Sequence, residues 1–222
     1  MTQIAQIKAR WRKAVEEENS SLVETLVKEI LTQHGMTALA AEIRYNRGVL
    51  NLTWGDGHGS ERLAKAMAEF ELGAKAADSV GESAEPWRSL LRSQLGACKS
   101  RLGNLAGATQ ELLAVGAYRP RTAAGLGALS LLTKLHKEAA SKEAGKYETQ
   151  RLSYARALVR ENTGLPPETL RFYQFLLAQE LLDSSFASEG EEILRELRGL
   201  GEATLGQEMY ADVLRLLEQR KG

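Results

Sequence analysis

The amino-acid sequence predicts an all-α fold of about eleven helices, and three observations support this prediction. Proline is scarce, with 4 in 222 residues, and aromatic residues make up only 6% of the chain. Alanine, leucine, glutamate, lysine and arginine are abundant, and these side chains lose the least conformational freedom on entering a helix. Apolar residues also recur every three or four positions, which is the period of a helix with one buried face.

The first six expected helices form three pairs, each delimited by apolar stripes and by cap or turn residues. Asn19 or Ser20 can cap the second helix, and Gly35 is a typical stop for it. Gly103 and Asn104 supply the turn inside the third pair. The expected helices span residues 2–17, 19–34, 36–54, 60–78, 84–102 and 104–115.

Five further helices are expected in the rest of the sequence. Pro120 opens the first of them, and the stretch 164–167 separates the second from the third. The last helix carries an apolar stripe that could cover the end of a helical stack. The expected helices span residues 120–140, 145–162, 167–183, 186–198 and 202–219.

No long linker rich in proline, glycine or serine separates these helices, so we expect one domain that spans residues 1–222. Amphipathic helix pairs joined by short turns cannot bury their apolar faces alone. They must therefore stack on their neighbours.

Residues 92–120 have the sequence RSQLGACKSRLGNLAGATQELLAVGAYRP, which resembles a tetratricopeptide repeat (TPR). Leu95 and Gly96 stand where that family has a Leu-Gly pair, Ala108 stands at the small residue of the second helix, and Pro120 at the terminating proline. Two antiparallel helices approach closely only where residues such as Gly96 and Ala108 lack bulk.

Weaker copies of the same pattern occur on both sides. In residues 45–57, YNRGVLNLTWGDG, Gly48 takes the close-packing position, and the second helix follows late, after the insertion GHGSER. Fainter copies lie at Leu126-Gly127 and Leu177-Ala178. The copies are irregularly spaced, so the resemblance implies a TPR-like α-solenoid, a right-handed superhelix of stacked antiparallel helix pairs, without a regular array.

The resemblance also implies a place for a partner. In TPR proteins the first helix of each pair lines a concave groove that receives a segment of another protein. Matching the copies gives these groove candidates: Tyr45, Val49, Leu52, Ser93, Ala97, Arg101, Phe172, Phe175, Gln179 and Asp183. The subclass that clamps a peptide carboxylate has lysine and asparagine at such positions, so binding of chaperone tails is disfavoured. The helix 167–183 is apolar nearly all round, and it is either buried on two sides or exposes a partner-binding face.

Composition excludes several function classes. Lysine plus arginine equals aspartate plus glutamate at 29 each, so no net field attracts nucleic acid. A local basic cluster, formed by Lys8, Arg10, Arg12 and Lys13, is expected to be a solvated face balanced by residues 16–18. No apolar stretch reaches the length of a membrane span, and the start of the sequence lacks a signal peptide. Together with the single cysteine, this predicts a cytoplasmic protein that binds no membrane.

No catalytic residue, metal ligand set or cofactor site is expected. The segment GDGHGS lacks the Gly-Lys-Ser/Thr ending of a phosphate-binding loop, and Asp56 and His58 have no third metal ligand at useful spacing. His34 is expected to end a helix, His136 to lie on the surface, and Cys98 to be a small packed residue.

We therefore expect a non-catalytic scaffold that binds a peptide or protein surface in its concave groove. An alternative is a regulatory or sensory helical-repeat domain of a bacterial signalling or transcription-control system, although no basic helix-turn-helix is visible. An enzyme is the third possibility, and a homo-oligomer is compatible with any of the three.

Overall fold

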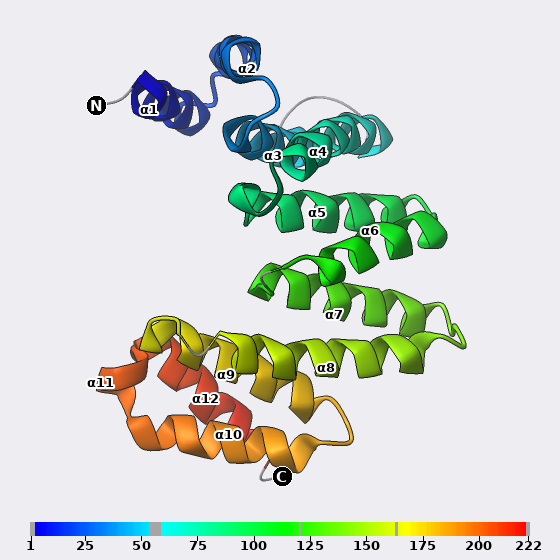
Figure 1. Cartoon of the computed structure of the whole chain (residues 1–222), viewed down its shortest axis with the longest axis vertical. Helices are drawn as coiled ribbons and strands as arrows, with labels where there is room; N and C mark the ends of the chain where they lie inside the picture. Colours follow the sequence, from blue (N-terminus) through cyan, green and yellow to red (C-terminus); the bar gives the residue numbers. More distant parts are fainter. Residues whose placement is uncertain (1–2, 54–58, 120, 163, 221–222) are drawn as a thin grey trace. The chain divides into compact units, whose positions relative to one another are not determined.

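The computed structural model describes residues 3–53, 59–119, 121–162 and 164–220, and these ranges consist of helices joined by short turns and loops, without a strand (Figure 1). The all-α prediction is confirmed. The α-helices are α1 Gln3–Glu16, α2 Ser20–His34, α3 Ala38–Thr53, α4 Gly59–Val80, α5 Trp87–Arg101, α6 Leu105–Ala117, α7 Ala123–Glu138, α8 Ala144–Glu161, α9 Pro167–Leu182, α10 Ala187–Leu200, α11 Glu202–Leu205 and α12 Gln207–Glu218. A 3-10 helix, η1 Gly81–Ala84, follows α4.

The prediction of eleven helices was wrong at the C-terminal end, where the expected helix 202–219 is two helices. Gly206 separates α11 from α12 with φ of 79°. This left-handed conformation suits glycine and cannot continue a right-handed helix. Near residue 120 the helix starts later than expected, because Thr122 caps α7 by accepting a hydrogen bond from the Gly125 N–H. Pro120 itself lies outside the described residues.

The predicted cap and turn residues take their expected roles. The Asn19 side chain accepts a hydrogen bond from the Leu22 N–H at 3.0 Å, and Gly35 ends α2 with φ of 49°. Gly103 turns the chain with φ of 75°, and the Asn104 side chain accepts from the Gly107 N–H at 2.8 Å. These local signals confirm the predicted boundaries of α2, the end of α5 and the start of α6, whereas α5 begins at Trp87 and not at the expected residue 84.

The chain divides into two compact units, Met1–Val115 and Gly116–Gly222, and each has its own core. In the first unit one buried cluster joins α1, α2 and α3, and another joins α3, α4, η1 and α5. In the second unit a cluster joins α9 and α10 to the C-terminal helices. There Leu205, Val213 and Leu217 pack against α9 and α10, so the predicted apolar stripe of the last segment is buried. The expected single domain over residues 1–222 stays a prediction.

Two consecutive hairpins of the first unit share one packing arrangement. A Cβ atom on Gly48 of α3 would collide with the Phe70 ring of α4, and a Cβ atom on Gly96 of α5 would lie 2.7 Å from Cγ of Leu112 in α6. Both glycines therefore have the close-packing role predicted for them. An ion pair accompanies each contact: Arg44 donates to Glu69 at 2.9 Å and Arg92 donates to Glu111 at 2.5 Å.

The fainter copies in the second unit differ from each other. A Cβ atom on Gly190 of α10 would lie 2.8 Å from the Ala178 carbonyl oxygen of α9, so these helices also approach through small residues. Gly127 is exposed and has no atom within 4 Å of an added Cβ. Gly125 is the close-packed glycine of α7 instead, because it faces the Tyr154 hydroxyl. The expected copy at Leu126-Gly127 therefore lacks its close-packing contact.

Within the described ranges, none of the helices combines the length and apolar character needed to cross a lipid bilayer.

Candidate functional site

The groove candidates on α3 are part of the helix packing. Tyr45, Val49 and Leu52 are half-buried and pack against the cluster of α3, α4, η1 and α5. The Tyr45 ring centroid lies 6.2 Å from that of Phe70 and 5.5 Å from that of Trp87. These side chains have limited surface left for a partner.

Of the three groove candidates on α5, only one is exposed to solvent. Ser93 is half-buried and its hydroxyl donates to the Ser89 carbonyl at 2.8 Å, while Ala97 is also half-buried. Arg101 is exposed in the last turn of the helix.

The α9 candidates separate into a buried and an exposed group. Phe175 is 6% exposed and belongs to the core of the second unit, whereas Phe172 is 41% exposed. The apolar helix α9 therefore has one buried aromatic side chain and one that is partly exposed. Gln179 and Asp183 come together in a cleft of about 150 Å³ between α9 and the end of α12. The structure thus places two of the predicted residues in one hollow.

Two larger clefts of the second unit lie along α8, a helix that the TPR resemblance did not single out. Their volumes are about 510 Å³ and about 380 Å³, and both are lined by Thr149 and Ser153. We call these two neighbouring clefts together the α8 groove. Thr149, Ser153, Arg156 and Arg160 recur at the spacing of one helix face, and Leu152 and Tyr154 flank that face on opposite sides. The α8 residues that line one or both clefts are Lys146, Thr149, Gln150, Leu152, Ser153, Tyr154, Arg156, Ala157 and Arg160.

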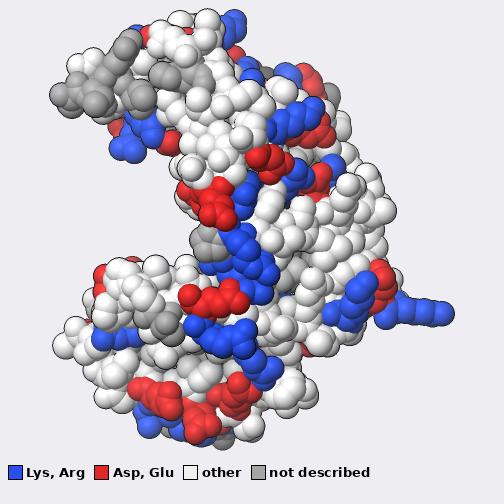
Figure 2. Space-filling view, in the orientation of Figure 1, with Lys and Arg blue, Asp and Glu red and all other residues white. Residues whose placement is uncertain are grey.

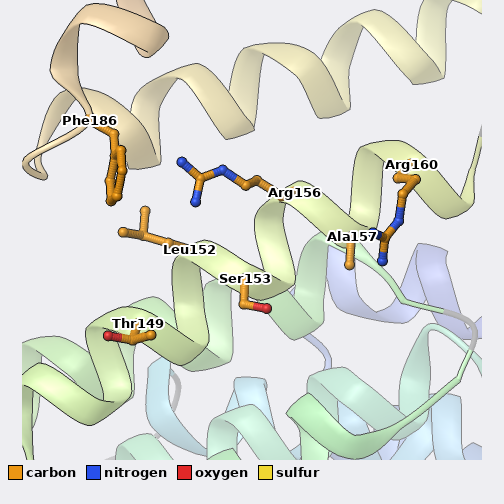
Figure 3. A pocket seen from close by; sticks show the side chains of 7 residues that line it. All are labelled: Thr149, Leu152, Ser153, Arg156, Ala157, Arg160 and Phe186. Carbon is orange, nitrogen blue, oxygen red and sulfur yellow. The ribbon is translucent and has the colours of Figure 1, made fainter.

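The walls of the α8 groove come from connections that are distant in sequence. Arg119 and Arg121, which follow α6, line the larger cleft together with Leu129 of α7. Phe186, which precedes α10, lines the smaller one (Figure 3). In Figure 3 the Arg156 side chain extends from α8 toward Phe186, and Leu152 lies beside the same ring.

Five cationic side chains line the α8 groove, and carboxylates outside its lining pair with three of them. Arg121 pairs with Glu161, Arg156 with Glu189 at 2.6 Å, and Lys146 with Glu143 at 3.5 Å. Arg119 donates to two backbone carbonyls, and Arg160 is exposed without an ion pair among the described residues. Acidic side chains likewise lie next to basic ones on the face of the protein drawn in Figure 2.

A partly exposed aromatic ring lines the smaller cleft of the α8 groove. Phe186 is 44% exposed, and the Arg156 guanidinium lies 4.6 Å from its ring centroid, within the range of a cation–π interaction. Because Glu189 holds the same guanidinium through two hydrogen bonds, Arg156 is fixed in orientation.

Tyr154 lines the larger cleft, on the opposite side of α8 from Leu152. Its hydroxyl accepts a hydrogen bond from the Thr122 N–H at 3.0 Å, and the Arg121 guanidinium lies 5.5 Å from its ring centroid. Burial is the main cause of a raised pKa for Tyr154, so the phenol is neutral at physiological pH.

The lining of the α8 groove supplies groups suited to binding. Its described residues include no carboxylate and no histidine, and they supply hydrogen-bond donors, positive charge and apolar contacts. In the part of the chain that the structure describes, no three side chains of His, Cys, Asp or Glu are grouped to hold a metal. Asp56 and His58 of the glycine-rich segment lie outside the described residues.

Cys98 is buried, as predicted, and burial raises the pKa of its thiol.

The prediction that His136 lies on the surface was wrong. Its side chain is only 5% exposed, and its ring centroid lies 4.5 Å from that of Tyr147. Its spacing from Leu129 and Leu132 continues the buried stripe of α7, a signal that could have shown its burial.

The N-terminal basic cluster is partly neutralised by carboxylates, as expected, although most of the partners come from other helices. Lys8 pairs with Glu42 at 2.5 Å, Arg10 with Glu29 at 3.9 Å, and Lys13 with Glu17 at 3.7 Å.

The sequence did not predict the α8 groove, because none of its lining residues by itself indicates a binding site. Spaced polar residues on a helix usually mark a solvated face. Arg121 and Phe186 lie in separate loops, and only the tertiary structure brings them to the same helix.

The sequence matches no known family model and no curated protein.

Proposed function

We propose that this chain is a TPR-like helical-repeat protein that binds a peptide or protein surface and has no catalytic centre. The observation that carries the proposal is the packing shared by the α3/α4 and α5/α6 hairpins. In both, an arginine on the first helix pairs with a glutamate on the second, and a glycine receives a large apolar side chain. Repeated hairpins of this kind typically serve as scaffolds for binding other proteins.

Exposed apolar and basic side chains support a binding role in the second unit. Phe172 and Phe186 are partly exposed on different elements, and the α8 groove lies beside Phe186. Single exposed apolar residues are common on protein surfaces, but an aromatic ring at the edge of a hollow is a typical anchor for a partner.

Among the candidates inferred from the TPR resemblance, we propose those with open side chains as contacts. They are the exposed Arg101, Phe172 and Asp183, together with the half-buried Gln179, which lines the same cleft as Asp183. Tyr45, Val49, Leu52 and Phe175 have mainly a packing role, because each one contacts a buried cluster.

Site-specific photo-crosslinking in the source cells tests this proposal. A benzoylphenylalanine residue at position 101, 172 or 186 is expected to capture one reproducible partner protein. Position 72, where Leu72 is exposed on α4, serves as the control. Capture of no protein at the three test positions, or of the same proteins at position 72, would contradict a binding role.

A further inference from the structure

We infer that the α8 groove binds an acidic peptide segment of about six residues that includes one large apolar side chain. This inference rests on the proposed function, since it names the ligand class and the surface. The α8 groove is distinct from the groove implied by the TPR resemblance, because α8 is the second helix of its expected pair.

The length of the groove sets the length of the segment. At a rise of about 1.5 Å per residue, the part of α8 from Lys146 to Arg160 is about 21 Å long. An extended peptide advances about 3.3 Å per residue, so about six residues follow this face.

The charge of the groove sets the sign of the ligand. Lys146, Arg156 and Arg160 lie on one face of α8, and Arg119 and Arg121 line the wall opposite. No lining residue in the described part carries a negative charge. Arginine forms paired hydrogen bonds with carboxylates, and exposed Arg160 has its donors available for them.

The smaller cleft, which Phe186 lines, supplies the apolar contact. Leu152, Ala157 and Phe186 line the smaller cleft, and the Phe186 ring is open to solvent over part of its surface. A leucine or aromatic side chain of the peptide can pack on this ring, while an acidic neighbour reaches Arg160. Such an aromatic anchor with charged groups around it is typical of binding hot spots.

The charge pattern favours a short acidic peptide over a nucleic acid. Glu143, Glu161 and Glu189 already pair with three of the five cations, so the groove has too few uncompensated positive charges to match the closely spaced charges of a phosphate backbone. The formal net charge of the chain is zero, so no long-range field attracts a polyanion.

Peptide selection tests the inference. A phage library of random eight-residue peptides is selected against the full chain, and enriched peptides are synthesised with fluorescein for anisotropy titrations. We expect acidic peptides with one leucine or aromatic residue. Their affinity should fall at least tenfold in Arg160→Glu and in Phe186→Ala, and it should weaken with rising salt.

Arg198→Glu is the matched control. Arg198 is also an exposed arginine in the last turn of a helix of the second unit, and it lies outside the α8 groove. This variant should keep the affinity within twofold. Circular dichroism and the melting temperature check that each variant is folded, and Arg160→Glu changes an exposed side chain.

Three results would overturn the inference: no enrichment, enriched peptides without acidic residues, or binding that both groove variants leave intact. A single-stranded oligonucleotide of 20 nucleotides that displaces the peptide and depends on Arg160 would assign the groove to nucleic acid instead. If crosslinking at position 101 or 172 captures a partner but the groove variants have no effect, the inference fails and the proposed function stands. If neither method gives a partner, the proposed function itself fails.

Discussion

The phenol of Tyr154 on α8 closes the N-terminus of α7 by accepting a hydrogen bond from the backbone N–H of Thr122 at 3.0 Å. Thr122 in turn caps α7 through its side chain, which accepts from the Gly125 N–H at 3.1 Å. Gly125 lies against the same phenol, where a side chain would not fit. One buried tyrosine therefore fixes the start of α7 and the position of Arg121 in the wall of the α8 groove.

Tyr154→Phe should lower the free energy of unfolding by about 1–2 kcal/mol, because the backbone N–H of the half-buried Thr122 loses its acceptor. Urea denaturation followed by circular dichroism measures the change. Tyr210→Phe is the control, since the Tyr210 hydroxyl makes no hydrogen bond among the described residues. Equal stability of the two variants would show that the contact contributes nothing.

Stability should decline at alkaline pH in a way that depends on the buried tyrosines. Burial is the main cause of raised pKa values for Tyr147, Tyr154 and Tyr173. A tyrosine whose pKa is higher in the folded state binds more protons there. The stability it contributes is present below the unfolded pKa of about 10 and is lost as the pH rises through the folded value.

We therefore expect the free energy of unfolding to fall as the pH rises past the unfolded tyrosine pKa of about 10, and to fall less steeply in Tyr154→Phe. Urea titrations of both proteins at several alkaline pH values measure the two slopes, and the difference between the slopes removes the contribution of the lysines, which both proteins share. A steeper decline in the variant would mean that folding lowers the pKa of Tyr154, contrary to the expected effect of its burial.

Gly96→Ala should destabilise the protein by about 1–3 kcal/mol, because an added Cβ lies 2.7 Å from Cγ of Leu112, which is fully buried and cannot move aside cheaply. Gly127→Ala is the matched control within a helix. Its Cβ meets nothing within 4 Å, so the better helix propensity of alanine should stabilise by about 0.5–1 kcal/mol. Thermal and urea unfolding measure both, and opposite signs are the expected result.

Glu180→Gln should lower the free energy of unfolding by about 2–3 kcal/mol. Glu180 of α9 accepts from Arg151 of α8 at 2.9 Å and from the Ser130 hydroxyl of α7 at 2.6 Å, so it joins three helices. Removing its charge leaves the buried Arg151 guanidinium poorly compensated.

The control for this pair is Glu138→Gln, which breaks an exposed pair with Lys134 and should change stability by less than about 0.5 kcal/mol. A comparable loss in both variants would mean that burial of the α8–α9 pair has no special effect.

Cys98 should react slowly with a disulfide reagent such as 5,5′-dithiobis(2-nitrobenzoate) while the protein is folded. The thiol is buried in the cluster of α3, α4, η1 and α5, and burial raises its pKa, so little reactive thiolate is present near neutral pH. Absorbance at neutral pH should show full reaction only after denaturant is added. Because Cys98 is the one cysteine in the sequence, the rate of its labelling measures only local unfolding around α5. Rapid labelling of the native protein would show that α5 separates easily from its neighbours.

The sequence by itself determined the all-α class and most helix boundaries, because these depend on contacts between residues close in the chain. Asn19 caps its helix through a neighbour three residues on, and the left-handed glycines Gly35 and Gly103 end theirs. The glycines at close helix contacts were also predictable where a repeat-like pattern surrounds them, as at Gly48 and Gly96.

Only the tertiary structure decided which glycine of α7 meets another helix and where the C-terminal helix breaks. Gly125 and Gly127 are close in the sequence, but only Gly125 faces Tyr154. Gly206 interrupts a continuous apolar stripe so that both resulting helices reach the same core. The α8 groove likewise requires Arg121 and Phe186 to approach one helix from separate connections. Spacing along the chain records local hydrogen bonding and helical faces, whereas these contacts depend on how whole helices pack.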